Sequence, residues 1–320
     1  MSKKYTFAVS IVLSVLFTFA FLFLTVEIPL RVGYLLKDYF PDLGFQTEAI
    51  KAFLNRVRLI GYLCLGTVIA LIIIGFAVKG RLAFLGSLTL FLPTFGYFAH
   101  SMFFLAGIGI LRVLWMTFFD ITPELLKLGD IIYVPAIIIM YLFRPLGLDV
   151  RIPLSFLFMA LGLLILFLGV SAWTFGKIAG KKIIDFWIYR YSRHPQYLGF
   201  ILWSYGVMLL ATFTPFPRGG YFPEPSFPWL ISALIIICVG LMEETQMVER
   251  YNEYSKYRNN VPFMLPIPNA LSNMITFPFR ILTRKEFPEN RRDVIYIFIL
   301  YSAIFTGLSL LFLMLKVPLR

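Results

Sequence analysis

The sequence predicts an all-α fold: a polytopic transmembrane helical bundle with about eight membrane spans. Three observations predict it. Hydrophobic residues make up 59% of the 320-residue chain, and charged residues make up 14%, against roughly 25% in soluble domains. The mean hydropathy is +0.82. Uncharged apolar segments of about 20 residues, enough to cross a bilayer, recur along the chain. This composition excludes a soluble enzyme and a disordered chain.

Seven uncharged segments are long enough to span a membrane, at 5–26, 59–78, 82–111, 152–176, 195–217, 225–242 and 294–315. The first segment follows Lys3 and Lys4 but lacks a small-residue cleavage site, so we expect a mature helix there. A shorter run of 13 residues at 131–143 gives the eighth predicted span.

Basic residues predict the direction of these spans. With eight crossings, 20 of the 29 Lys and Arg residues fall on one side, and both termini fall on the other. The basic side holds loops 27–58, 112–130, 177–194 and 243–293. The positive-inside rule places that side in the cytoplasm. If the run at 131–143 does not cross, every span before it reverses, and the last three spans keep their direction.

The net charge of +12 fits basic loops beside anionic lipid headgroups, so we expect a bilayer and no nucleic acid as partner. Cys64 and Cys238 lie inside apolar runs and are expected to pack as small hydrophobic residues. No Cys/His cluster has metal-ligand spacing, and no metal site is predicted.

The first gathering of polar groups lies where a basic, aromatic loop enters the span at 195–217. Pro195 suits the first turn of a helix, because its missing N–H would be unpaired there anyway. Arg193 and His194 would then flank free backbone N–H groups at the positive end of the helix dipole, a site for a carboxylate or phosphate. Gly199 allows a ligand or another helix to approach the backbone closely.

The second gathering is the pair Glu243 and Glu244 at the end of the apolar run 225–242. Carboxylates at a membrane edge are costly unless they are paired or solvated. Glu244 shares a helix face with Met247 and Val248, so we expect it to turn into the bundle. Glu243 is displaced by about 100° around the helix and is expected at the rim.

Each of these groups also has a simpler interpretation. Arg193 and its basic neighbours are also what a topology signal requires. The two glutamates also suit a helix end, paired with Arg250. His100, within the span at 82–111, is a candidate proton carrier or a hydrogen-bonded packing residue.

Taken in order, Arg193-His194-Pro195-x-Tyr197-x-Gly199, a hairpin of two spans, Glu243-Glu244 and Val261-Pro262 resemble the isoprenylcysteine carboxyl methyltransferase family and the wider phospholipid methyltransferase group. The resemblance covers about residues 152–266. It implies an S-adenosylmethionine pocket at the cytoplasmic membrane face and a lipid or lipidated methyl acceptor. It implies as cofactor-site residues Arg193, His194, Pro195, Tyr197, Leu198, Gly199, Glu243 and Glu244.

The same resemblance divides the chain into three parts. Residues 1–150 hold N-terminal transmembrane helices without an assigned role. Residues 151–268 form the methyltransferase-like membrane core. Residues 269–320 hold an interfacial segment and a terminal transmembrane helix.

The sequence departs from the family pattern at three places. Tyr251-Asn252 stands where the family usually has Phe-Gly, with one residue fewer before Tyr254. Trp187 stands where the family often has Gly, and Phe263 stands where it often has Arg or Lys. One alternative is an NADPH-dependent membrane reductase of the sterol or steroid type, which uses a similar His/Asn-Pro-x-Tyr-x-Gly turn. Its members often carry Glu where Phe200 stands and usually lack the glutamate pair. The other alternative is a non-catalytic membrane protein.

Overall fold

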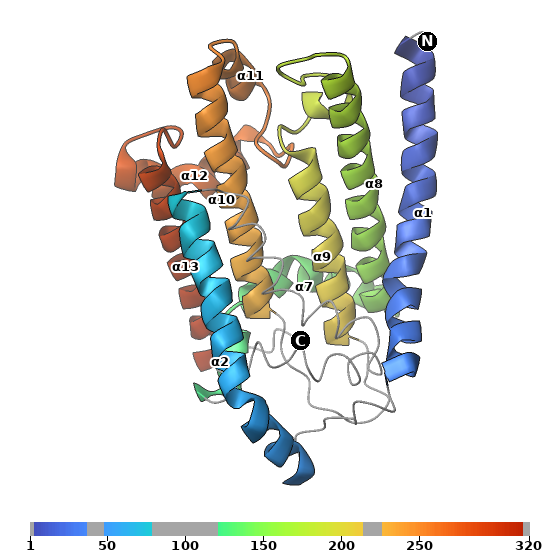
Figure 1. The fold of residues 1–320 in the computed structure, drawn as a ribbon, viewed down its shortest axis with the longest axis vertical. Helices are drawn as coiled ribbons and strands as arrows, with labels where there is room; N and C mark the ends of the chain where they lie inside the picture. Colours follow the sequence, from blue (N-terminus) through green and yellow to red (C-terminus); the bar gives the residue numbers. More distant parts are fainter. Residues whose placement is uncertain (1–2, 37–47, 79–120, 214–225, 316–320) are drawn as a thin grey trace.

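The computed structural model describes residues 3–36, 48–78, 121–213 and 226–315, and over these it is helical, with 3-10 turns and loops between the helices. Its α-helices are α1 (Lys3–Leu36), α2 (Glu48–Ala77), α7 (Val134–Phe143), α8 (Arg151–Ile178), α9 (Pro195–Phe213), α10 (Ser226–Arg250), α11 (Tyr254–Asn260), α12 (Asn269–Thr283) and α13 (Arg291–Met314). The long helices run roughly side by side, as Figure 1 shows.

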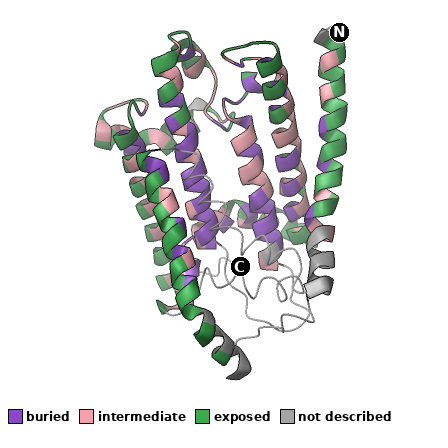
Figure 2. Ribbon diagram, viewed as in Figure 1, coloured by how far each residue is buried: buried purple, intermediate pink, exposed green. Residues whose placement is uncertain are grey.

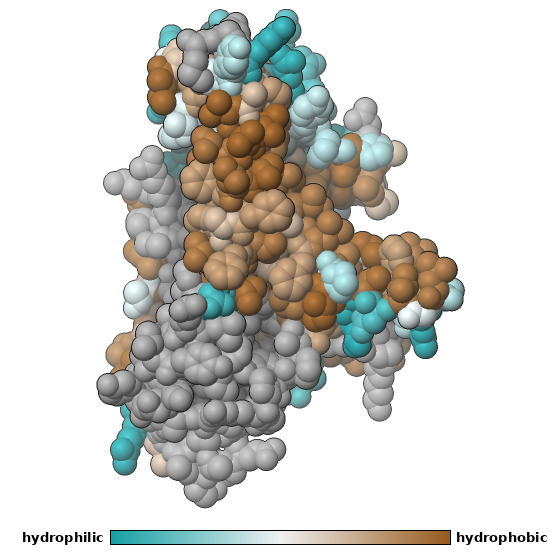
Figure 3. Space-filling model, turned by 90° about the vertical axis from the view of Figure 1, so that its right-hand side faces the viewer, coloured by the Kyte–Doolittle hydropathy of each residue, from teal (hydrophilic) through white to brown (hydrophobic). Residues whose placement is uncertain are grey.

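Five of the described helices, α1, α2, α8, α10 and α13, are long and apolar enough to cross a membrane. The chain is therefore a multi-pass integral membrane protein, and the predicted all-α class is confirmed. Of the five, α10 is the most enclosed by protein, whereas α1 and α13 expose most of their surface (Figure 2). The face built by α1 is covered by apolar side chains in Figure 3, as a lipid-facing surface requires.

α9 begins at Pro195, as predicted, and forms an antiparallel hairpin with α8. Glycines bring the two backbones together. A Cβ on Gly199 would lie 2.5 Å from the backbone N of Leu166, and one on Gly162 would lie 2.2 Å from that of Trp203. Small residues at such contacts let membrane helices approach closely. Gly199 therefore serves the approach of a helix, one of the two roles expected for it.

The segment 131–143 is not a helical span. It folds as the 3-10 turn Asp130–Tyr133 and the ten-residue helix α7, which is about 15 Å long and too short for a core of about 30 Å. The run at 82–111, with His100, lies outside the described residues.

The direction of α1 follows from its contacts with α8 and the loop after it. The rings of Phe7 and Trp187 lie 5.3 Å apart, the hydroxyl oxygens of Ser14 and Ser171 lie 3.3 Å apart, and Phe17 stacks on Phe167. The start of α1 therefore lies at the end of the bundle that carries residues 177–194. We call it the upper end, as drawn in Figure 1.

The predicted topology is therefore wrong before α8. The N-terminal residues were expected opposite the loop 177–194 and lie beside it. Loops 27–58 and 112–130 were expected at the upper end. The described parts of both lie at the lower end, where the Ser226 hydroxyl donates to the Leu126 carbonyl. The reversal is the one that follows when 131–143 does not cross.

The charge bias survives this correction. Fifteen described Lys and Arg residues lie toward the upper end: Lys3, Lys4, Lys177, Lys181, Lys182, Arg190, Arg193, Arg250, Lys256, Arg258, Arg280, Arg284, Lys285, Arg291 and Arg292. Seven lie toward the lower end: Arg31, Lys51, Arg56, Arg58, Lys127, Arg144 and Arg151. The upper end therefore remains the more basic one.

Polar anchors fix the lower half of the bundle and leave the upper ends of α9 and α10 to build a site. The Trp229 indole donates to the Ser204 hydroxyl at 3.0 Å, which joins α10 to α9. The Tyr205 hydroxyl donates to the Ile132 carbonyl at 2.8 Å. Above them, the Cys238 thiol lies 3.8 Å from the Val294 carbonyl and marks the contact of α10 with α13.

Candidate functional site

The start of α9 is held by the segment that follows α11. The backbone N–H of Arg193 donates to the Pro262 carbonyl at 3.0 Å, and that of His194 donates to the Phe263 carbonyl at 3.2 Å. The backbone N–H groups of the two residues that flank the helix start are therefore already paired within the protein. A carboxylate or phosphate site at the N–H groups of the first turn of α9 stays a prediction.

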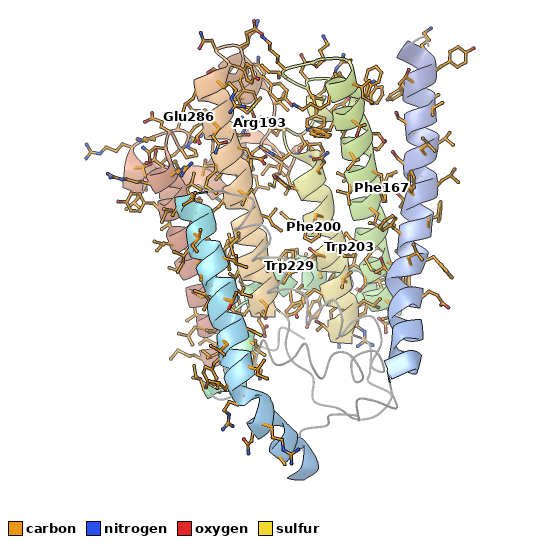
Figure 4. All side chains as sticks on the ribbon, viewed as in Figure 1. Phe167, Arg193, Phe200, Trp203, Trp229 and Glu286 are labelled. Carbon is orange, nitrogen blue, oxygen red and sulfur yellow. The ribbon has the colours of Figure 1, made fainter. Side chains whose placement is uncertain are left out.

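Arg193 lies inside the protein rather than on a lip. Its side chain is 4% exposed, and its Nε lies 2.9 Å from Oε1 of Glu244, which is 3% exposed. Its Nη1 donates to the Arg258 carbonyl at 2.5 Å. We call Arg193, Glu244 and the Arg258 carbonyl the buried clamp. It ties α9, α10 and α11 together at the upper end, above Phe200 and Trp229 in Figure 4.

Glu244 is buried, as its helix face predicts. The same Oε1 that meets Arg193 also lies 3.1 Å from Nε2 of His194. With its proton on Nε2, the imidazole donates to this carboxylate. Arg250, the alternative partner considered from the sequence, is exposed at the end of α10.

Glu243 points the other way, with 49% of its side chain exposed. The Tyr197 hydroxyl donates to its Oε1 at 2.8 Å, and Nδ1 of His194 lies 4.0 Å from its Oε2. The rings of His194 and Tyr197 lie nearly parallel, at 9° and 5.6 Å. We call Glu243, Tyr197 and the outer edge of His194 the open rim.

Two further residues, Gly240 and Phe263, shape this site and were not among those predicted. The ring of Phe263 lies 5.0 Å from that of His194. A Cβ on Gly240 would lie 3.2 Å from Cζ of Phe263 and 3.4 Å from Cδ2 of Tyr197. The position of Gly240, one helical turn before the glutamate pair, was the available signal. Phe263 was noted only as a departure from the family pattern.

Tyrosines back the buried clamp. The Tyr257 hydroxyl donates to the Tyr189 carbonyl at 2.6 Å. Burial, and after it the nearby Glu244 charge, raises the pKa of Tyr254 well above its ordinary value. Burial likewise raises the pKa of Tyr257. Both phenols are therefore neutral at physiological pH and act as packing and hydrogen-bonding groups.

Two other predicted site residues, Pro195 and Gly199, pack against α8. Pro195 and Gln196 approach Gly169, where a Cβ would lie 3.3 Å and 3.0 Å from their Cγ atoms. Leu198 is buried, and Gly199 packs on α8 as described above. A role for Pro195, Leu198 or Gly199 in cofactor contact stays a prediction.

Other features of the described residues lie away from this cluster. No group of three or more His, Cys, Asp or Glu side chains among them is arranged to hold a metal ion. A hollow of about 410 Å³ lies where α12 meets α13, lined by Leu282, Thr283, Lys285, Asp293 and Tyr296. It shares no residue with the buried clamp or the open rim.

Residues 175–261 match a family model. That family is an uncharacterised membrane family, described as "Protein of unknown function (DUF1295)". The matched segment runs from the end of α8 to Val261, so it contains Arg193, His194, Tyr197 and both glutamates. It is about a quarter of the chain and assigns no activity. No curated protein and no solved structure matches.

Proposed function

We propose that the protein is an integral membrane methyltransferase that uses S-adenosylmethionine and acts on a lipid or lipidated acceptor. One observation carries the proposal. The polar side chains of the methyltransferase-like pattern lie in one cluster at the membrane edge. In the sequence, a whole helical hairpin separates Arg193, His194 and Tyr197 from the two glutamates that they contact. A pattern kept only as a topology signal would not require His194 and Tyr197 to reach both glutamates.

The open rim fits part of this cofactor. S-adenosylmethionine presents an ammonium group and ribose hydroxyls, which are donors for a carboxylate. Glu243 is the exposed carboxylate, with Tyr197 orienting its Oε1. The parallel rings of His194 and Tyr197 provide an apolar, flat surface beside it.

The buried clamp takes a different role in the proposal. Arg193 and Glu244 are each almost fully buried, and their charged groups lie 2.9 Å apart. We therefore propose that they hold the start of α9, the end of α10 and α11 in place, and that they do not contact the cofactor directly. His194 links the two regions, because its Nε2 meets Glu244 and its Nδ1 faces Glu243.

The cofactor would supply an electrophilic methyl group, which the acceptor would take by in-line attack as the neutral thioether S-adenosylhomocysteine leaves. The protein's share of the rate is then largely the positioning of the acceptor. A carboxylate or thiolate acceptor needs no general base. An amine acceptor would lose its proton to Glu243, because Glu244 is committed to Arg193 and the phenols of Tyr254 and Tyr257 are neutral.

The position of the site along the membrane normal supports an acceptor that arrives from the bilayer. α10 and α13 run antiparallel and touch at Cys238 and Val294. Glu243 lies five residues above Cys238, about 7.5 Å, and Arg291 lies three residues above Val294, about 4.5 Å. The open rim is thus level with the start of a candidate span, where lipid headgroups begin.

We assign the upper end to the cytoplasm, where S-adenosylmethionine is made. The basic residues described above support this orientation. Together with α9 and the predicted span at 82–111, the five candidate spans give seven crossings in place of eight. The N-terminal residues then lie in the cytoplasm.

The first experiment measures binding of radiolabelled S-adenosylmethionine and of NADPH to the purified protein. We expect saturable binding of the former only. Glu243→Gln should weaken it about tenfold or more, since a lost polar contact costs about 1–3 kcal/mol. Glu249→Gln, an exposed carboxylate farther along α10, is the matched control and should bind as the wild type does. NADPH binding would support the reductase, and binding of neither would support a non-catalytic protein.

The acceptor is identified separately. The protein is incubated with methyl-labelled cofactor and an extracted lipid pool, and labelled products are analysed by mass spectrometry. Label in the organic phase that depends on Glu243 supports the proposal.

A further inference from the structure

α12 is oriented with its most apolar side facing away from the protein. The side against the bundle carries Ser272, Thr276, Phe279 and Thr283, spaced by helical turns, and of these only Phe279 is a large apolar residue. An amphipathic helix at a protein–water boundary has the opposite arrangement, with its apolar stripe turned to the core.

The outward side is strongly apolar. Its residues are each at least 41% exposed and share one stripe of the helix: Leu271, Met274, Ile275, Ile281 and Leu282. Figure 2 shows α12 at the outer edge of the bundle, with exposed surface on it. Such a surface suits acyl chains better than water.

The third side of α12 is polar and basic apart from Phe277, which is 60% exposed. Asn273, Arg280 and Arg284 follow one another at helical spacing, and Arg284 ends the helix. Arg291 and Arg292 begin α13 close by. Glu286 lies 3.8 Å from Arg280 and neutralises only part of this charge.

The height of α12 matches a membrane boundary. Its Phe279 packs in the same buried cluster as Val294 and Ile297 near the start of α13. At the other end, the Ile131 N–H donates to the Ser309 hydroxyl. Arg291 and Ser309 are 18 residues apart, about 27 Å of helix, close to the thickness of a hydrocarbon core.

From these observations, we propose that α12 is an interfacial helix that binds anionic phospholipids of the leaflet at the upper end. Its outward side contacts their acyl chains, and Arg280 and Arg284 contact their phosphates. The hollow beside Lys285 is not the phosphate seat, because Asp293 lines it and Lys285 is already paired with Asp293 and Glu289. This inference does not depend on the proposed enzymatic function.

The test places a fluorescent bimane at Ile281, through I281C in a C64A/C238A background. The protein is reconstituted in phosphatidylcholine vesicles that contain a small, equal fraction of doxyl-labelled phosphatidylglycerol or doxyl-labelled phosphatidylcholine. We expect both lipids to quench the bimane, and the phosphatidylglycerol label to be at least about fivefold enriched at the probe, the enrichment that about 1 kcal/mol from a single basic residue near an anionic surface gives.

R280Q/R284Q should remove the preference for phosphatidylglycerol and leave quenching by phosphatidylcholine. The matched control is R144Q/R151Q, which removes two arginines at the lower end and should keep the preference. If R280Q/R284Q fails to fold, the labelled I281C protein with both arginines in place is measured in 1 M NaCl. The salt screens exposed charges and should abolish the preference for phosphatidylglycerol.

Three results overturn the proposal. Equal quenching by the two lipids shows a lipid-facing helix without anionic recognition. Quenching by neither lipid shows that protein or water covers Ile281. A preference that persists in 1 M NaCl shows that Arg280 and Arg284 are not its source.

Discussion

The buried clamp and the open rim are adjacent in sequence and opposite in character. Glu244 in the clamp is 3% exposed and meets a guanidinium, whereas Glu243 in the rim is 49% exposed and meets a phenol. Two neighbouring carboxylates on one helix therefore lie in different environments, one in the protein interior and one at the surface. The difference teaches that two adjacent acidic residues in a membrane protein can have different roles, with one joining helices in the interior and the other exposed at the surface.

The largest effect expected from this division is on stability. Glu244→Gln leaves Arg193 buried without a charged partner, and breaking a buried ion pair from one side costs about 3–5 kcal/mol. We expect a clear fall in the unfolding temperature of the purified protein, and loss of turnover with it. Glu243→Gln should leave the unfolding temperature unchanged.

A double variant tests whether the loss of stability comes from the unpaired Arg193 charge. Replacing both partners, as Arg193→Met with Glu244→Met, removes the uncompensated charge and should recover part of the stability. If the double variant is no better than Glu244→Gln, the two side chains are not coupled in the way the 2.9 Å contact indicates.

The second expected effect concerns His194, which touches both regions. His194→Ala should weaken S-adenosylmethionine binding about tenfold or more, because it removes a ring from the rim and a partner from Glu244. Equilibrium binding with labelled cofactor measures it. His100→Ala changes the chain's other histidine and should have no effect. Equal effects of the two variants would remove the site from this position.

The difference between clamp and rim was partly predictable from the sequence. Helical periodicity placed Glu244 on the inner face and Glu243 at the edge, and both positions are confirmed. Proline chemistry placed the start of α9 at Pro195 correctly. Local patterns of this kind depend on one helix at a time, so a single sequence is enough to predict them.

The partners of these residues could not be predicted in the same way. The carbonyls of Pro262, Phe263 and Arg258 come from a segment more than 60 residues away, and no local pattern shows that it folds back onto α9. The direction of α1 depended on whether 131–143 crosses the membrane. The segment does not cross, because its helix has ten residues and is too short for the hydrocarbon core.

The third expected effect tests the loop that supports the clamp. Trp187 has a φ of 53°, in the left-handed region that favours glycine, and it stacks on Phe175 at 5.3 Å and 18°. Trp187→Ala loses the stacking and keeps the strained backbone, whereas Trp187→Gly loses the stacking and relieves the strain. Trp187→Gly should therefore be the more stable of the two by about 1 kcal/mol, as measured by chemical unfolding.

This order is the reverse of the usual one, in which Gly is less stable than Ala. If Trp187→Ala is the more stable variant, the loop does not hold a left-handed residue at this position. A parallel comparison at Ile188, which lies outside the left-handed region, should give the usual order.

The last expected effect is a small one and lies within the open rim. Tyr197→Phe removes the hydroxyl that donates to Glu243 and keeps the ring that lies parallel to His194. Water can replace that hydroxyl at a carboxylate that is half exposed, so the unfolding temperature should not change. Binding of S-adenosylmethionine should weaken by about 0.5–1.5 kcal/mol, the net contribution of one hydrogen bond, because Glu243 is then less well oriented.

Tyr197→Leu, which also removes the ring, should weaken binding further. Equal binding by Tyr197→Phe and Tyr197→Leu would show that the ring contributes nothing to the rim, and a fall in stability with Tyr197→Phe would show that the rim belongs to the same structural unit as the clamp.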